Sequence, residues 1–353
     1  MHQFDSAWDL YENLSFVYEL TRMFVKESSF GKEKQRKLSS GLSIRKCFFN
    51  NEKCTEGNFT WYFHYNYGNC LRFNSGKNKS LSIRNTMTEG PAFGLSLIVS
   101  LPTNQNSYPD INGVGLKVFV HNKSFSPLTA EEINIDPGKE ANVAIRRIHT
   151  HKTPWPYSEC QDLTGFKSMY FQALQSANKT YRQYDCYRLC LQNLIVNNCG
   201  CYFTRNARLD NSTRPCLNST QLKCIKTQMS VFKINEECTE QCPLECYKVM
   251  YETQATSLVF PSESFYRVLL NDTSFLLQPN LTLDDMRQSL VSLKIYYTFT
   301  QYTLITETPK TGMFDLFSQV GGTLQIFLGF SIFHLIELFE ICFILLFSLR
   351  VIR

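Results

Sequence analysis

Histidine is scarce in this chain, and the cysteines are not spaced like zinc ligands. Only six histidines occur among the 353 residues. No Cys-x-x-Cys pair lies near a second such pair, which is the usual arrangement of a structural zinc site. His149 and His151 have no obvious ligand partners in the sequence. The sequence therefore argues against a metal centre and predicts no cofactor.

Long runs of one charge are also absent. The formal net charge is +5, and Glu33 interrupts the basic run from Lys32 to Lys37. A solvated loop accounts for so short a run, so nucleic acid is not an expected partner. The sequence contains neither a nucleophile–base constellation nor a phosphate-binding loop, and we do not expect an enzyme.

A secretory signal is missing at the N-terminus. Acidic residues interrupt residues 1–25, which lack the apolar core of a signal peptide. The long apolar run lies instead at the other end, where Glu337, Glu340 and Arg350 are the formal charges between Val320 and Ile352. About 20 apolar residues suffice to span a bilayer, and basic residues at the end of the run fit a cytoplasmic C-terminus. Because nothing upstream would start export, we expect that an N-terminal piece precedes this sequence.

Cysteine, in contrast, is abundant. Fourteen cysteines are present, and thirteen of them precede residue 250. Nine Asn-x-Ser/Thr sequons are spread along the same part of the chain. This combination favours disulfides over metal binding and predicts an oxidising, glycosylated, extracellular compartment. The sequons begin at Asn13, Asn58, Asn78, Asn122, Asn178, Asn211, Asn218, Asn271 and Asn280.

The spacing of apolar residues predicts a mixed α+β outer region. Helical spacing is found in two segments, and the second carries Cys186 and Cys190 four residues apart on one face. Alternating or continuous apolar runs bounded by turn residues predict the strands. The expected helices cover residues 7–25 and 181–197, and the expected strands cover 95–101, 114–121, 142–149, 246–260 and 290–306.

Several motifs, taken in their order along the chain, resemble one family. They are Tyr67–Asn74 (YGNCLRFN), the run Cys186-x3-Cys190-x8-Cys199-x-Cys201, Leu293–Tyr297 followed by Glu307, Gly321-Gly322, and Gly329-Phe330-Ser331. From about residue 44 to its end, the chain resembles the epithelial sodium channel, degenerin and acid-sensing ion channel family, the amiloride-sensitive sodium channels.

The resemblance implies a fold and an assembly. It implies a disulfide-rich, hand-like extracellular domain of finger, thumb and palm, followed here by one transmembrane helix. It also implies a trimer in the plasma membrane, with sodium as the permeant ion and with other channel subunits and membrane lipid as partners. The expected divisions are a finger-like region over 1–90, palm and β-ball strands over 91–160, the thumb over 161–246, palm strands over 247–310, the second membrane helix over 311–349 and a cytoplasmic end over 350–353.

The same resemblance implies the disulfide pairs. Cys70 is left over, because Cys342 lies inside the apolar run and the family partner of Cys70 follows the first membrane helix. A free or intermolecular thiol is the alternative for Cys70. The implied pairs are Cys47–Cys54, Cys160–Cys246, Cys186–Cys242, Cys190–Cys238, Cys199–Cys224 and Cys201–Cys216.

Gly329, Phe330 and Ser331 match the selectivity region of the family. Small residues let backbones approach a pore axis closely, and a helix broken here would leave carbonyls that can replace water on an ion. A plain helix–helix contact is the alternative interpretation of Gly329 and Ser331.

Acidic residues follow the selectivity region. His334, Glu337 and Glu340 fall within an arc of about 120° on an ideal helix. Charges inside a membrane span usually face an aqueous path, so we expect Glu337 and Glu340 to attract cations. For Glu340, an alternative is that its side chain reaches toward the cytoplasmic interface.

Three positions match gating or blocking sites of the family. Ser318 falls where bulky substitutions hold degenerin-type channels open, and Trp155 resembles a wrist tryptophan that contacts the first membrane helix; a core tryptophan is the alternative. Gln325 stands where amiloride-type blockers act, and its bulk argues against amiloride sensitivity.

Lys226 and Ser230 occupy thumb positions that are acidic in acid-sensing members, which argues against proton gating.

Three functions follow from these patterns. The first is a subunit of a trimeric, voltage-independent, sodium-selective channel. The second is a single-pass receptor or adhesion protein with a cysteine-rich ectodomain, although a simple anchor needs neither the Gly-x-Ser nor the two glutamates. The third is a non-conducting subunit that modulates its partners, and the sequence leaves this alternative open.

Overall fold

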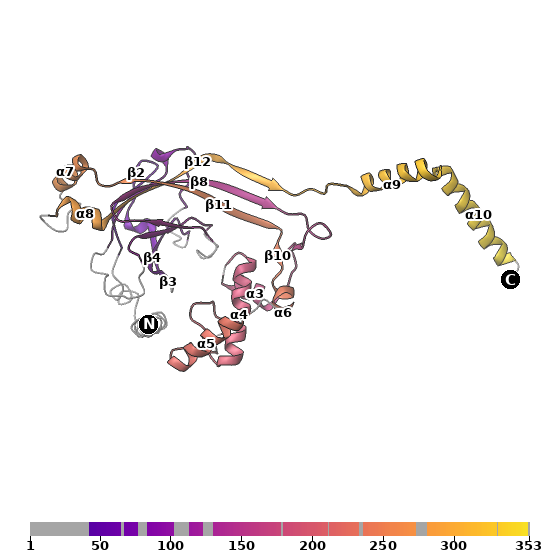
Figure 1. Ribbon diagram of the computed structural model, residues 1–353, viewed down its shortest axis with the longest axis horizontal. Coiled ribbons are helices and arrows are strands. Elements are labelled where there is room, and N and C mark those ends of the chain that lie inside the picture. The colour runs from indigo at the N-terminus through magenta and orange to yellow at the C-terminus, as the bar shows by residue number, and fades with distance from the viewer. Residues whose placement is uncertain are drawn as a thin grey trace, which may run out of the picture.

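The computed structural model describes residues 42–64, 67–76, 83–101, 113–122, 130–177, 179–210, 212–232, 236–272, 281–329 and 331–351. The helix expected over residues 7–25 lies outside these residues. Figure 1 shows a long sheet with helices below it and two further helices beyond one of its ends.

A six-stranded sheet forms the centre of the molecule. Its order is β11-β8-β12-β5-β1-β2. β8 lies between antiparallel β11 and parallel β12, and β12 also pairs antiparallel with β5. The strands are β1 (Ser43–Phe49), β2 (Glu52–Lys53), β5 (Leu95–Ser100), β8 (Lys139–His151), β11 (Tyr247–Val259) and β12 (Leu290–Thr306).

The sheet has its apolar core at one end. Alternate residues of β5 and the first half of β8 are buried, as the two-residue period of a strand dictates. β12 begins with four buried residues and ends with eight exposed ones, so it leaves the core as it runs along the sheet. Gly94 is required in front of β5, because a Cβ there would lie 2.1 Å from the carbonyl oxygen of Ile295. The core contains Leu95, Leu97, Val99, Ala141, Val143, Val291 and Leu293, among others.

Smaller elements surround the sheet. Three two-stranded ribbons are β3 (Phe59–His64) with β4 (Gly68–Phe73), β6 (Leu116–Phe119) with β7 (Glu132–Ile135), and β9 (Cys160–Gln161) with β10 (Leu244–Glu245). Short 3-10 helices are η1 (Glu56–Asn58) and η2 (Pro91–Phe93). Two helices, α7 (Glu263–Asn271) and α8 (Leu283–Ser289), lie at the far end of the sheet (Figure 1).

Four helices form a lobe below the sheet, between residues 169 and 241 (Figure 1). Ser168 caps the first helix through its side chain, and an Asn218–Gln221 capping box begins the third. Gly200 ends the second helix in the left-handed conformation that glycine adopts readily. The helices are α3 (Met169–Ser176), α4 (Gln183–Cys199), α5 (Ser219–Val231) and α6 (Glu236–Gln241).

Two apolar helices, α9 (Met313–Leu328) and α10 (Ile332–Val351), follow β12 and extend away from the sheet (Figure 1). The sequence predicted one membrane helix over residues 311–349. The structure instead breaks this segment between Leu328 and Ile332. The predicted strand over 290–306 agrees with β12, and the predicted helix over 181–197 is α4 shifted by two residues.

Candidate functional site

Gly329 ends α9 and creates the first half of the break. Its φ is 61°, and its N–H bonds the carbonyl oxygens of Gln325 and Leu324. No atom lies within 4 Å of a Cβ built on Gly329, so the left-handed backbone is what favours glycine here, rather than lack of space. The sequence named this glycine as part of a selectivity region, and the structure places it at the helix end.

Ser331 and His334 create the second half, at the start of α10. The Ser331 Oγ lies 2.9 Å from His334 Nδ1, and the Ser331 N–H points to the same nitrogen at 3.4 Å. The His334 N–H in turn donates to the Ser331 carbonyl oxygen at 3.1 Å. Phe330, between the two caps, lies outside the described residues. Sequence reasoning missed the His334 contact, because the usual capping box has Glu or Gln at the third residue after Ser and not His.

The two caps produce a sharp bend. In the described residues, no single helix is long and apolar enough to cross a membrane. Met313–Phe327 and Ile332–Leu345 meet that criterion together, with 89° between them. Non-helical backbone at membrane depth is tolerated only where protein buries it or water lines it.

The acidic side chains of α10 lie just beyond the bend. Glu337 and Glu340 are both exposed in this chain, as is His334. The helix period places His334, Glu337 and Glu340 within the predicted arc. Glu337 lies about one turn beyond His334, and Glu340 lies about two turns beyond it. α9 carries a single charged residue, Asp315, whose carboxylate accepts from the Gly312 N–H at 3.1 Å at the opposite end of that helix.

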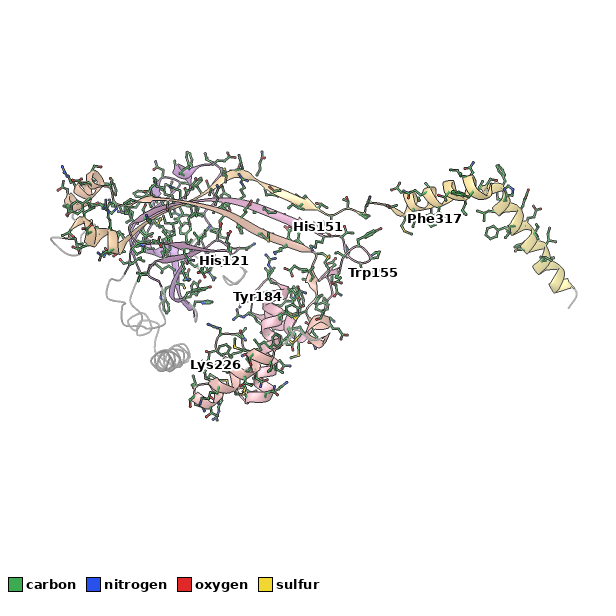
Figure 2. The ribbon with its side chains drawn as sticks, viewed as in Figure 1. His121, His151, Trp155, Tyr184, Lys226 and Phe317 are labelled. Carbon is green, nitrogen blue, oxygen red and sulfur yellow. A yellow bond between two sulfur atoms is a disulfide. The ribbon has the colours of Figure 1, made fainter. Side chains whose placement is uncertain are left out.

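The predicted gating residues occupy two places. Ser318 and Gln325, seven residues apart, fall on nearly the same face of α9, and both are exposed. Trp155 lies in the loop that follows β8, on the side of the sheet from which α9 extends (Figure 2). The Trp155 side chain is 84% exposed, so it is not a core tryptophan.

Hydrogen bonds tie the Trp155 loop to the segment that leads into α9. The Thr153 hydroxyl donates to the Glu307 carbonyl oxygen at 2.6 Å. The Glu307 N–H donates to the His151 carbonyl oxygen at 2.9 Å. These two hydrogen bonds join the loop to the chain six residues before α9 begins. No local sequence pattern indicates this contact, because 154 residues separate Thr153 from Glu307.

Five nested disulfides cross-link the helical lobe, and a sixth closes a short loop beside the sheet. Cys186 and Cys190 hold one face of α4 against the returning chain, as the resemblance implied. Cys70, half-buried, and Cys342, exposed, take no part in these bridges. The bridges join Cys47–Cys54, Cys160–Cys246, Cys186–Cys242, Cys190–Cys238, Cys199–Cys224 and Cys201–Cys216.

A buried ion pair joins the lobe to the sheet. Arg182 Nη1 lies 3.0 Å from Glu245 Oε1, and both side chains are more than nine-tenths buried. Arg182 also donates to the Val249 carbonyl oxygen of β11 at 2.6 Å. Glu245 Oε2 accepts from the Gln183 N–H at 3.0 Å and so caps α4 from another part of the chain. The signal that sequence reasoning missed is an arginine at a position where Ser, Thr, Asp or Asn normally caps a helix.

Burial shifts the pKa of two groups near the Arg182–Glu245 ion pair, Asp185 and Tyr181. It raises the pKa of Asp185, whose Oδ2 is buried without a hydrogen-bond partner in the described structure. Burial, and then the charge of Glu245, raises the pKa of Tyr181, which donates to the Pro243 carbonyl oxygen at 2.7 Å.

Lys226 and Ser230, the thumb positions considered for proton gating, are exposed on α5.

The asparagines of four of the nine sequons lie in the described residues. Asn58 and Asn122 are half-buried, whereas Asn218 and Asn271 are exposed. Asn13, Asn78, Asn178, Asn211 and Asn280 lie outside the described residues.

Comparison with known proteins decides the family. The family described as "Amiloride-sensitive sodium channel" matches residues 4–341, nearly the whole chain. The chain belongs to the amiloride-sensitive sodium channel family. The six disulfides and the mixed α+β architecture fit that membership, and the family is one of ion channels, not enzymes.

Individual members of the family match over most of this chain. Degenerin del-1 of Caenorhabditis elegans is 26% identical over 328 residues, which cover 90% of this chain and 46% of that protein. The epithelial sodium channel subunit beta of Bos taurus is 29% identical, covering 84% and 46%. The subunit gamma of Pelodiscus sinensis is 27% identical, covering 86% and 45%. The chain thus spans less than half the length of these relatives.

Proposed function

We propose that this chain forms part of a voltage-independent, sodium-selective channel composed of three subunits. The observation that carries the proposal is the break at Gly329–Ser331, which interrupts the apolar helix pair where the family places its selectivity region. The related epithelial sodium channel subunits are named alpha, beta and gamma, which supports assembly with homologous subunits as well as with copies of this chain.

The break can supply oxygen ligands. The last carbonyls of a helix have no intrahelical partners, and they carry the negative end of the helix dipole. At the end of α9, the Gly329 N–H bonds the carbonyls of Leu324 and Gln325, and we propose that the later carbonyls face water or an ion. Three copies around an axis would form a ring of such oxygens, with the carboxylates of Glu337 and Glu340 drawing cations toward it.

The outer domain would control this pore. We propose the hand-like division given above, with a finger-like region over 1–90, a thumb over 161–246 and palm strands before and after it. The ectodomain would be extracellular and glycosylated in the plasma membrane, with the C-terminus cytoplasmic. Ser318 and Gln325 would lie on the pore-facing side of α9, and Trp155 would couple the palm to the membrane helices.

Recording with ion replacement tests the proposal. Cells that express the full-length subunit are expected to carry an inward current that falls when external sodium is replaced by a large organic cation. Gly329→Ala should lose preference for sodium over potassium, because alanine is strained at a φ of 61°. Val320→Ala is the control, since Val320 is helical, exposed and on the face of α9 opposite Ser318.

The outcomes separate the alternatives. A current that ignores sodium replacement would contradict the proposal. A subunit that reaches the surface, conducts nothing alone and changes the current of a co-expressed family member would show the modulatory function instead. A receptor or adhesion protein would neither carry a sodium current nor change the current of a co-expressed family member.

A further inference from the structure

The cap at the start of α10 contains a group that can gain a proton. In an ordinary capping box, Ser or Thr is followed three residues later by Glu or Gln, whose side chain accepts from the backbone N–H of the cap residue. Here Ser331 is followed by His334, and both the Ser331 N–H and its hydroxyl lie against Nδ1. Histidine is the side chain that changes charge between about pH 5 and 8.

We propose that His334 is a positioning residue for cation selectivity, which it exerts by orienting the Ser331 hydroxyl. This inference rests on the proposed function, because it takes Ser331 to lie on the ion path. A backbone N–H can only donate, so its contact with Nδ1 identifies Nδ1 as an acceptor. The hydroxyl then also donates to Nδ1, and its lone pairs are left for a cation.

Protonation reverses this arrangement. When a proton binds Nδ1, both imidazole nitrogens become donors. The Ser331 hydroxyl then accepts from Nδ1–H and turns its own hydrogen away from the ring, while the Ser331 N–H loses its acceptor. No covalent bond changes other than the new N–H bond. A hydroxyl hydrogen on the ion path repels a cation that the lone pairs would bind.

The charged groups around His334 are few in the described residues. On α10, Glu337 lies one turn further along, and Glu340 lies two turns further. On the α9 side of the break, Gln325 and Gly329 are uncharged, and Asp315 is at the opposite end of that helix. The imidazolium charge itself would also oppose a nearby cation, so the test must separate charge from orientation.

The test compares the sodium-to-potassium permeability ratio of the full-length subunit at about pH 8 and about pH 5.5 on each side of the membrane. For wild type we expect the ratio to fall about fivefold in acid, the worth of one neutral hydrogen bond. His334→Gln keeps an acceptor that does not titrate, so its ratio should be unchanged between the two pH values. Surface biotinylation controls for expression.

Ser331→Ala separates orientation from charge, since it keeps the imidazole but has no hydroxyl to reverse. We expect its ratio to change less than twofold with pH. A fivefold acid effect that persists in Ser331→Ala or in His334→Gln would overturn the inference while leaving sodium conduction intact. Absence of a sodium current at every pH would instead overturn the proposed function.

Discussion

At the scale of single residues, Arg182 and Glu245 join the helical lobe to the sheet. Each carboxylate oxygen has its own partner, one the guanidinium and the other the first N–H of α4. Arg182 reaches further, to the backbone of β11. A buried ion pair stabilises only when its remaining hydrogen-bonding groups are also satisfied, and these two backbone contacts help to satisfy them.

Removing one partner of this pair is expected to be costly. Glu245→Gln should lower the free energy of unfolding by about 3 kcal/mol, because it leaves the Arg182 charge buried. Thermal unfolding of the full-length subunit in detergent measures the effect. Glu263→Gln removes the partner of Arg267 in an exposed pair, and it should cost less than about 0.5 kcal/mol. Equal losses in the two variants would show that burial does not control the energy of this joint.

Asp185 is expected to destabilise the folded protein at neutral pH. Burial raises its pKa in the folded state above the usual 3.8, so the folded state holds a proton that the unfolded state has already released. Stability therefore falls as pH rises through the window above 3.8 and then levels off. Asp185→Asn should raise the Tm at pH 7, with the gain shrinking to nothing near pH 3. A constant gain at all pH values would contradict this account.

The sequence anticipated some of these residues and not others. Helical spacing placed Cys186 and Cys190 on one face of α4, and a family resemblance supplied the six pairs found in the structure. Arg182 and Glu245 are 63 residues apart, and each is a common surface residue type. Nothing local marks them as buried partners, because their burial depends on how the lobe returns to the sheet.

At the scale of elements, the nested disulfides differ in the length of chain that they close. With Cys186–Cys242 in place, the outermost bridge, Cys160–Cys246, closes 26 residues on one side (186 − 160) and four on the other (246 − 242), whereas Cys47–Cys54 closes seven. The entropy of loop closure predicts stabilisation of about 4 and about 2 kcal/mol respectively. Replacing both members of the longer bridge with alanine should therefore lower the Tm more. Differential scanning fluorimetry of the two double variants checks the order, and the reverse order would contradict the loop-length argument.

The break between α9 and α10 shows what an apolar pattern leaves undetermined. Hydropathy marks the whole run from residue 313 as suitable for a membrane, and it has no means of locating a bend. The bend arises from local caps, a left-handed glycine and a serine–histidine contact. Strand β12 was more predictable, because its alternation and length are both recorded in the sequence.

At the scale of the whole molecule, β12 connects the buried core to the apolar helices α9 and α10. It begins among core residues, pairs with β8 as far as Thr306 and continues into the segment before α9. The Trp155 loop is bonded to that segment through Thr153 and Glu307. Figure 2 shows Trp155 and Phe317 on either side of this segment. The sheet is therefore linked to the segment before α9 by the covalent chain of β12 and by the hydrogen bonds of the Trp155 loop.

Trp155 is expected to influence gating without supporting the fold. Because 84% of its surface is exposed, Trp155→Ala should change the free energy of unfolding by less than about 0.5 kcal/mol. The same variant should alter the open probability of surface-expressed channels. Met87→Ala, at a side chain 93% exposed elsewhere, should change neither quantity. Unaltered gating in Trp155→Ala would remove this residue from the coupling route.

The order of the lobe bridges has a consequence for biosynthesis. The innermost bridge, Cys201–Cys216, spans 15 residues, and each bridge outside it encloses the previous one until Cys160–Cys246 spans 86. Once an inner pair has formed, the next two thiols are held close together, so its closure costs less chain entropy. Oxidation that starts at the innermost pair can thus proceed outward, because each bridge brings the next two thiols together. An early outer bridge would have to select its partner from many remaining thiols, and would then depend on an isomerase to correct its errors.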